Sequence, residues 1–480
     1  MLAAHLTQGL QLSTYLLERL QQKKIKFAHW KGNVHLLESL EGKTDIELLL
    51  RPEDREDFEA TMAELNFKKA ESAPWNKYPQ VEDWLGFDEE TGALLHLHTH
   101  YALIIPTSYG DYVPLPWTEQ FFKHLTTDEA TGWPIPETAM EALILLVRLQ
   151  IKGQNPENIL HDVHLEKKQE LLVLLSKTDA ERFAACCAEL RLRAPVDLAD
   201  RISHILAKER LGDIIALSDF IYRQLPASIK SAASRRSPRA LYYEYFLKTL
   251  KHYKPLIKPV RLKKRVETGG RVIALVGSDG SGKSTLSQDI TSWLTYKIDT
   301  HYFYMGKLPF IKSYQTRLFS YTDLLASRNL LARVTRKLLG DLYHILIIRQ
   351  KASMLKQARE LSDGGSIAIC DRYPQQEVFG FNDGPRLQGN PHSMLARLEM
   401  KYFDQALQTG ADIIFRLIVS PETAHQRKPE HHYEDIRRKC ESITSISFSA
   451  NTPATVIDID ANAPYEEVLL QLKRHIWQRL

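Results

Sequence analysis

From Arg271 to Leu480, short apolar runs alternate with longer stretches in which apolar residues recur every three or four positions. The short runs predict strands at Val272–Val276, Ala368–Cys370, Ile413–Val419 and Val456–Ile459, and the stretches between them predict helices. Strands that alternate with helices form parallel sheets with helices on both faces. We therefore expect an α/β domain at residues 271–480.

The first half of the chain shows two further patterns. The elements predicted before the turn at Pro114–Pro116 are an amphipathic helix at Met1–Leu20, an apolar stretch at Phe27–Trp30, strands at Asp45–Leu50 and Ala93–Ile105, and a helix at Arg55–Leu65. From Pro136 to Leu225 the apolar spacing is helical. We expect a small α/β domain at residues 1–118, a helical domain at 119–228 and a linker at 229–270.

Composition agrees with several globular domains in a reducing compartment. The chain has 480 residues, of which 44% are hydrophobic and 25% charged, so a disordered or fibrous protein is excluded. The four cysteines, Cys186, Cys187, Cys370 and Cys440, have neither metal-site spacing nor a disulfide framework. No apolar run reaches the roughly 18 to 20 residues of a membrane span. We expect a cytoplasmic protein without a signal peptide.

Basic charge is concentrated in one segment. The net charge of the chain is +4, whereas residues 228–268 carry twelve Lys or Arg against Glu244 and Glu267. Tyrosines are interleaved with these cations from Tyr242 to Tyr253. The segment is interpreted as a solvated linker helix, or as a contact for an anionic partner such as a membrane surface or a nucleic acid.

A phosphate-binding loop follows the first strand of the C-terminal domain. The run is Gly277-Ser278-Asp279-Gly280-Ser281-Gly282-Lys283-Ser284-Thr285, with a helical pattern from Thr285. It satisfies G-x-x-x-x-G-K-[ST] between a strand and a helix. Glycines let backbone N–H groups surround phosphate oxygens, and the helix N-terminus adds partial positive charge. We expect Lys283 to bridge the β and γ phosphates of ATP and Ser284 to ligate Mg²⁺.

Three further residues are candidates for the same site. Asp371 ends a predicted strand, where a carboxylate reaches a metal ion beside the loop, and Arg372 follows it. Arg427 follows a short helix and precedes a polar stretch, so we expect it on a mobile lid that closes over the transferred phosphoryl group. Lys428, Arg437 and Arg438 are weaker candidates for that role.

The stretch from Arg271 to Leu480 resembles the thymidylate kinase family of P-loop kinases. The loop, Asp371-Arg372-Tyr373, and the segment from Ser420-Pro421-Glu422 to Arg427-Lys428-Pro429 carry the resemblance. It implies that Asp279 touches the acceptor or its metal-bound water, that Asp371 and Arg372 organise metal and phosphoryl groups, and that Arg427 comes from the lid. It also favours a dimer.

Two departures from the family fall in its acceptor-recognition regions. Tyr302-Phe303-Tyr304-Met305-Gly306-Lys307 stands where the family has Arg-Glu-Pro-Gly-Gly, and Asn382-Asp383-Gly384-Pro385-Arg386 follows Asp371-Arg372-Tyr373. The acceptor is therefore expected to be nucleotide-like or sugar-containing, without being identified as thymidylate.

A second constellation lies near the N-terminus. Trp30-Lys31-Gly32-Asn33 precedes Asp45-Ile46-Glu47 and resembles the nucleotidyltransferase pattern, in which two carboxylates on one strand face hold a divalent metal. Asn33 replaces the commoner serine. His96, His98 and His100 share one face of a later strand, and imidazoles suit Zn²⁺ better than Mg²⁺. Active nucleotidyl transfer, a degenerate binding fold, a coincidental acidic strand and a zinc site all remain open.

Three functions follow from these motifs. The leading one is ATP- and Mg²⁺-dependent phosphoryl transfer by the C-terminal domain to a small-molecule acceptor. The alternative is nucleotidyl transfer by the N-terminal domain, with the P-loop domain as a nucleotide-sensing partner. A third is a non-catalytic module that binds ATP to switch conformation.

Overall fold

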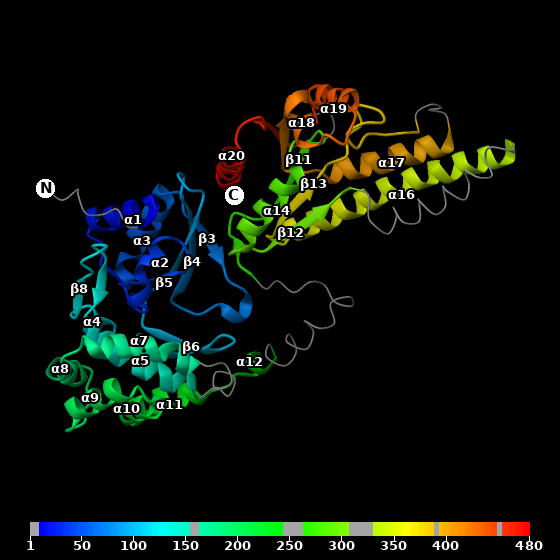
Figure 1. Ribbon diagram of the computed structural model, residues 1–480. Coiled ribbons are helices and arrows are strands. Elements are labelled where there is room, and N and C mark those ends of the chain that lie inside the picture. The colour runs from blue at the N-terminus through cyan, green and yellow to red at the C-terminus, as the bar shows by residue number, and fades with distance from the viewer. Residues whose placement is uncertain (1–8, 154–162, 243–262, 307–329, 388–392, 449–453) are drawn as a thin grey trace. The chain divides into compact units, whose positions relative to one another are not determined.

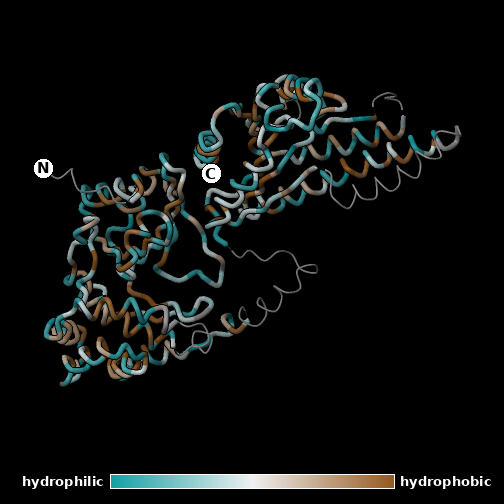
Figure 2. Tube along the Cα trace, viewed as in Figure 1, coloured by the Kyte–Doolittle hydropathy of each residue, from teal (hydrophilic) through white to brown (hydrophobic). Residues whose placement is uncertain are grey.

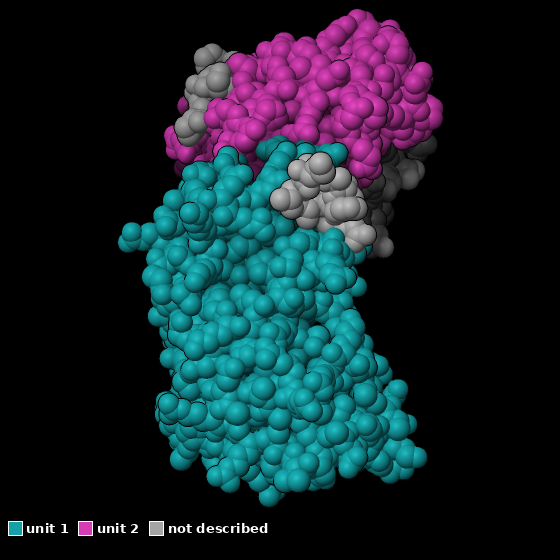
Figure 3. All heavy atoms as spheres, turned by 90° about the vertical axis from the view of Figure 1, so that its left-hand side faces the viewer, with its two compact units in different colours: residues 1–262 teal, residues 263–480 magenta. Residues whose placement is uncertain are grey.

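The chain consists of two compact units. The computed structural model describes residues 9–153, 163–242, 263–306, 330–387, 393–448 and 454–480. The units are Met1–Leu262 and Lys263–Leu480, coloured separately in Figure 3. Each is described below by itself.

A five-stranded parallel sheet forms the centre of the C-terminal unit (Figure 1). Its strands are β11 (Arg271–Gly277), β12 (Thr300–Tyr304), β13 (Ile367–Asp371), β14 (Ile413–Ile418) and β15 (Thr455–Asp460), and a short β10 (Arg265–Val266) precedes them. The spatial order is β12-β13-β11-β14-β15, and all four neighbouring pairs are parallel. The parallel sheet expected from the strand and helix alternation is confirmed. The chain changes direction across the sheet at β11 and β13, so a crevice opens at their carboxyl ends.

Helices cover the sheet of the C-terminal unit. They are α14 (Lys283–Thr295), α16 (Leu330–Asp363), α17 (Met394–Thr409), α18 (Pro421–Arg427), α19 (Tyr433–Ser445) and α20 (Tyr465–Trp477). On one face, alternate β11 residues such as Val272 and Ala274 pack with Leu355 of α16 and Ile443 of α19. The helix α14 packs against β11, β12 and β13 and also against α20. It begins at Lys283, two residues earlier than the sequence predicts.

A mixed sheet organises the first part of the N-terminal unit. Its strands are β1 (Phe27–His29), β2 (Ile46–Leu50), β3 (Lys68–Glu71), β4 (Val81–Phe87) and β5 (Leu94–His100). Their order is β1-β2-β5-β4-β3. The strands β2 and β5 are parallel, while β1 and β4 run antiparallel to their neighbours. Two hairpins follow, β6 (Ile104–Ser108) with β7 (Asp111–Pro114) and β8 (Leu125–Thr127) with β9 (Pro134–Pro136).

Short helices pack on this sheet. They are α1 (Gln11–Gln22), η1 (Asn33–His35), α2 (Leu36–Leu40), η2 (Pro52–Asp54), α3 (Arg55–Glu64), η3 (Pro74–Asn76) and α4 (Thr118–Phe121). Leu16 of α1 and Phe58 of α3 are fully buried against strand residues such as Leu48 and Leu97. The opening helix was predicted from Met1, and residues 1–8 lie outside the described residues.

The second part of the N-terminal unit is helical. Its helices are α5 (Thr138–Gly153), α7 (Val163–Ser176), α8 (Ala180–Glu189), α9 (Leu198–Lys208), α10 (Leu211–Arg223), α11 (Ala227–Ser234) and α12 (Pro238–Tyr242). Twelve side chains of α5 are buried, from Ala139 to Ile151, and Figure 2 shows apolar positions recurring along these helices. One hydrophobic cluster joins them to Ala28 of β1 and Leu49 of β2. This α-helical part therefore packs on the opposite side of the sheet from α1.

Several predicted elements differ from the structure. The run Ala93–Ile105 is not one strand, because the chain turns at Tyr101, whose N–H donates to the Gln80 carbonyl, and β6 begins only at Ile104. The strands β3 and β4 were not predicted, since Gly86 and several polar residues interrupt the β pattern there. Asp45 lies just before β2 instead of within it.

The predicted linker is partly folded. In α11, Ile229 and Ala233 are buried in the helical cluster, so the beginning of the segment 229–270 is packed structure. Most of the aromatic and basic stretch falls in residues 243–262, outside the described residues. No helix in the described ranges is both long enough and apolar enough to span a membrane.

Candidate functional site

The phosphate-binding loop connects β11 to α14 through two glycines with left-handed backbone. Gly280 has φ +83°, and a Cβ there would lie 2.4 Å from the Ala424 carbonyl oxygen. Gly282 has φ +84° and is the N-cap of α14. Only glycine adopts the backbone conformation of Gly280, at this distance from Ala424, without steric overlap. The glycines therefore let the loop curl tightly against α18.

Lys283 lies within this loop rather than in solvent. Its Nζ donates to the Ser278 carbonyl at 3.0 Å and lies 3.7 Å from Asp279 Oδ1. Burial, together with the nearby Arg372, lowers the pKa of Lys283 to about 8. An anion bound in the loop favours the charged lysine, because a positive charge in low dielectric is otherwise costly.

Buried polar atoms without partners surround the same loop. They are Ser281 Oγ, Asp371 Oδ1 and Arg372 Nε. Asp371 is 0% exposed at the end of β13, and its Oδ2 accepts a hydrogen bond from Tyr302 Oη at 3.1 Å. Native proteins rarely leave such groups unpaired. An acceptor, a hydroxyl and a donor grouped beside a P-loop fit Mg²⁺ and phosphate oxygens.

Arg372 has an unusual backbone conformation. Its φ is +83°, a region that costs a non-glycine residue about 1–2 kcal/mol. Its guanidinium lies 3.6 Å from Asp383, and Lys351 lies 2.6 Å from the same carboxylate. These two cations hold the pKa of the half-buried Asp383 below its usual value, although desolvation alone would raise it. Asp383 thus orients both cations at the site.

The loop opens into a cleft of about 540 Å³. The cationic lining residues are Lys351, Arg372, Arg386 and Lys439, with His431 beside them. Tyr304, Phe381 and Phe403 contribute aromatic surface. A concave site of this size suits a small molecule, and its cations suit one that carries phosphate or another anionic group.

Lys439 of α19 links the cleft to the loop. Its Nζ lies 2.6 Å from Asp279 Oδ2. Although burial alone would raise the pKa of Asp279, Lys439 and Lys283 lower it to about 2. Asp279, which also lines the cleft, is therefore ionised at neutral pH. It acts as an anchor for the two lysines.

Arg427 is not among the residues that line the cleft, and its role as a lid arginine over the phosphoryl group stays a prediction. Its Nη1 donates to the Ala461 carbonyl at 2.9 Å and contacts the Gly280 carbonyl at 3.4 Å. Because α18 packs its Ala424 backbone on Gly280, Arg427 at the end of that helix contacts the backbone of the loop.

The other predicted lid cations are also absent from the lining of the cleft. Arg437 pairs with Glu434 and Glu441 on the surface of α19, and Arg438 and Lys428 are exposed. Sequence reasoning missed Lys439, Lys351 and Asp383 as site residues. For Asp383 a signal existed, since it lies in a segment where the chain departs from the kinase pattern.

The remaining residues of the loop motif lie at the cleft, against α19 and in the first turn of α14. Gly277 lines the cleft, and the Ser278 hydroxyl oxygen accepts from the Cys440 thiol at 3.2 Å. Ser284 and Thr285 lie in the first turn of α14, where Ser284 is half-buried and Thr285 exposed.

The N-terminal constellation forms a separate charged cluster. Gly32 has φ +73°, and the Asn33 backbone N–H donates to Glu141 Oε1 at 3.0 Å while the Asn33 side chain contacts His29 at 2.7 Å. Burial raises the pKa of Glu141 to about 7. The turn before the predicted acidic strand is thus anchored to the helix α5.

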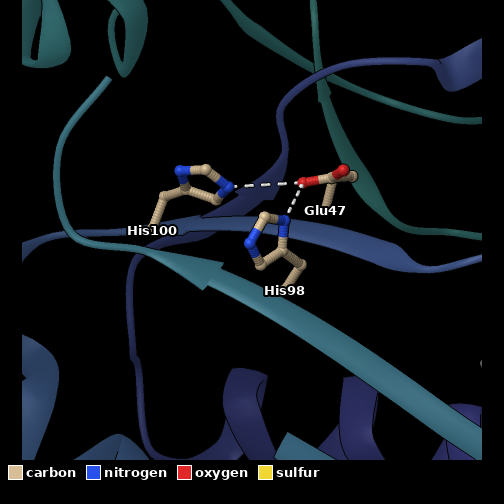
Figure 4. Close-up of side chains that lie close together, drawn as sticks. All are labelled: Glu47, His98 and His100. Atoms are coloured by element: carbon tan, nitrogen blue, oxygen red, sulfur yellow. Dashed lines mark hydrogen bonds and ion pairs between the residues drawn. The ribbon is translucent and has the colours of Figure 1, made fainter. Parts of the chain in front are cut away.

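Asp45 and Glu47 do not act as one pair of carboxylates. Asp45 lies 2.8 Å from His96, which also contacts Asp83. Glu47 contacts His98 and His100 (Figure 4). The register of β2 and β5 gives each carboxylate its own histidine partners, an arrangement that does not favour the expected pair of carboxylates around one metal ion.

Comparisons with known proteins are limited to part of the chain. No family model matches it. The chain is similar to the uncharacterized ATP-binding protein YghR of Escherichia coli (strain K12), 29% identical over 221 residues, which are 43% of this chain and 86% of that protein. It is also similar to the uncharacterized ATP-binding protein YghS of the same strain, 30% identical over 222 residues, which are 42% of this chain and 89% of that protein.

One solved structure, the thymidylate kinase from Ehrlichia chaffeensis, aligns with 43% of this chain and 98% of that chain. The identity is 20% and the TM-score 0.26. A similarity of that size supports no inference about fold or activity.

Proposed function

Because the chain belongs to the family that includes the ATP-binding protein YghS, we propose that its C-terminal unit binds ATP with Mg²⁺ and transfers the γ-phosphoryl group to a small-molecule acceptor. The observation that carries the proposal is the P-loop beside Asp371, opening into a cleft of about 540 Å³ that cations and carboxylates line together.

The residues divide the work between metal, phosphate and acceptor. Ser284 and Asp371 would hold Mg²⁺, which neutralises charge on the β and γ phosphates. Lys283 turns from the Ser278 carbonyl to the phosphate oxygens when ATP enters. Arg372 and Lys439 stabilise the charge that builds on the transferred group, because both line the cleft next to the loop.

The acceptor occupies the far part of the cleft. Phe381, Phe403 and Tyr304 offer faces for a base or a sugar ring, and Arg386 with His431 offers donors to an anionic substituent. The cleft therefore favours a nucleoside monophosphate or a phosphorylated sugar over a neutral acceptor. This chemistry supports the expected nucleotide-like or sugar-containing acceptor without selecting one compound.

The test is ADP release by the full-length protein with Mg²⁺ and a panel of nucleoside monophosphates and free and phosphorylated sugars. One or more anionic acceptors should accelerate ADP release, and Lys283→Ala should lower that rate by at least about 100-fold. Lys356→Ala, an exposed lysine of α16, is the matched control and should behave as the parent. ATP binding without acceptor-stimulated release would leave the conformational switch as the better explanation.

Nucleotidyl transfer by the N-terminal unit is not favoured by a specific observation. Its two expected carboxylates have separate partners, since Asp45 contacts His96 and Glu47 contacts Lys31. A two-carboxylate Mg²⁺ site would require both oxygens to face one ion.

A further inference from the structure

We propose that the N-terminal unit contains a zinc site formed by Glu47, His98 and His100. The three residues lie together in Figure 4, remote in sequence from the P-loop. The site is independent of the proposed phosphoryl transfer, because none of its residues belongs to the ATP cleft.

The sheet brings the three side chains to one face. In the parallel pair β2 and β5, Glu47 is the register partner of His98. His100 lies two residues further along β5, so its side chain projects from the same face. Two rigid neighbouring strands, and no loop, therefore position the ligand atoms.

The distances from Glu47 to the two imidazoles are close to those between ligands of a tetrahedral ion. Glu47 Oε2 lies 3.1 Å from His98 Nδ1 and 3.3 Å from His100 Nε2, and all three atoms lie within 4.8 Å of one another. Ligand atoms about 2.0–2.2 Å from a tetrahedral Zn²⁺ lie roughly 3.3–3.6 Å apart. Small side-chain rotations convert one arrangement into the other.

His100 supplies a second, independent indication of a ligand. It is 0% exposed, yet neither of its ring nitrogens makes a hydrogen bond. Its Nε2 lies 3.3 Å from Glu47 Oε2, which is an ion-pair contact. A buried imidazole whose nitrogens lack well-formed hydrogen bonds is unfavourable, and a metal ion bound between Nε2 and the Glu47 carboxylate would satisfy that nitrogen.

The surroundings favour Zn²⁺ and leave one coordination position open. Lys31 Nζ lies 2.9 Å from Glu47 Oε1, which fixes the carboxylate so that Oε2 faces the imidazoles, as partners of ligating carboxylates do. Two nitrogen ligands select Zn²⁺ over Mg²⁺. The side chains of Glu47 and His98 are 20% and 22% exposed, so water or an anionic ligand can reach the fourth position.

Another His, Glu and Cys cluster provides the control. His124, Glu137 and Cys186 also lie within ligand distance. However, His124 Nε2 contacts Glu189 at 2.8 Å, and its Nδ1 contacts Arg182 at 3.1 Å. Both ring nitrogens are satisfied without a metal, so we expect no ion there.

The experiment starts from metal-free, full-length protein. Equilibrium dialysis followed by elemental analysis measures how much Zn²⁺ the protein binds. A second measurement records the shift of the melting temperature when Zn²⁺ or Mg²⁺ is added. The parent should bind one Zn²⁺ per chain and gain thermal stability from Zn²⁺ but not from Mg²⁺. The His98→Ala variant should bind Zn²⁺ at least tenfold more weakly, and His124→Gln should bind it as the parent does.

His98 is partly exposed, so its replacement should preserve the fold, which circular dichroism verifies. Glu47→Gln is the second variant, since it removes the anionic ligand at nearly constant size. The proposal is overturned if the parent binds no Zn²⁺, or if both variants bind it with the affinity of the parent.

Discussion

Replacing Lys439 by Met tests whether the helix α19 supplies the cation that the sequence assigned to Arg427. The change keeps the length of the side chain and removes its charge, which lies 2.6 Å from Asp279 Oδ2. Loss of the partner should raise the pKa of Asp279, which is about 2 against an ordinary 3.8. That difference corresponds to about 2 kcal/mol, and Lys283 contributes part of it.

The stability effect has a defined sign and pH range. The depressed pKa of Asp279 stabilises the fold above about pH 4, and this contribution is lost as the pH falls through about 2. Lys439→Met should therefore lower the free energy of unfolding at pH 7 by about 1 kcal/mol, and the difference from the parent should shrink in acid. Urea unfolding of both proteins at pH 7 and in acid measures this difference in the free energy of unfolding.

The effect on activity should be larger than the effect on stability. If Lys439 contacts the phosphoryl group as charge develops, its loss should lower kcat by about 100- to 1,000-fold, with the affinity for an ATP analogue changed only a few-fold. Arg438→Met removes the same charge from an exposed neighbouring position of α19 and should leave kcat unchanged. Equal kcat values for both variants would refute the role of Lys439. A loss confined to Arg427→Met would restore the lid arginine.

Three further predictions concern the loop and its metal. Gly280→Ala should destabilise the protein by more than about 2 kcal/mol, because φ is +83° and the new Cβ meets the Ala424 carbonyl. Gly282→Ala has the same left-handed backbone but no close contact, so it should cost only about 1–2 kcal/mol. Thermal unfolding of the two variants measures the difference. Since burial lowers the pKa of Lys283 to about 8, the affinity for ATP should fall as the pH rises above about 8, and a flat titration curve between pH 7 and 9 would contradict this. Asp371→Asn should raise the Mg²⁺ concentration needed for half-maximal turnover, whereas an unchanged Mg²⁺ dependence would exclude its carboxylate as a ligand.

Local patterns allowed the phosphate site to be predicted because its parts are contiguous. The loop needs glycines, lysine and serine at fixed spacing between one strand and one helix, and Asp371 needs only a strand end. These features depend on neighbours in the chain. The order of strands in the sheet places β11 beside β13, which agrees with these assignments. The loop and Asp371 could be identified without knowing that order.

The partners contributed by distant helices could not be predicted in the same way. Lys439 reaches Asp279 across 160 positions of sequence, and the apolar spacing of α19 does not say which of its cations faces the loop. Arg427 was assigned from its place after a helix. The contacts of the Arg427 side chain depend on how closely α18 packs against Gly280. A local sequence pattern does not predict that packing distance.

The N-terminal site shows the same limit for strands. Glu47 and the three histidines were identified from alternation on single strands, but β4 was not predicted. Because Asp83 of that strand binds His96, His96 does not belong to the cluster of Glu47, His98 and His100. The metal ligands therefore depend on strand pairing as well as on the alternation of side chains.

The fate of the γ-phosphate tests the central claim most directly. ATP labelled at that position is incubated with Mg²⁺, the full-length protein and the acceptor that stimulates ADP release most. The account predicts that the label appears on the acceptor in equal amount to ADP, and that Lys283→Ala abolishes this transfer. Label found only in inorganic phosphate, released at the same rate by Lys283→Ala, would contradict it.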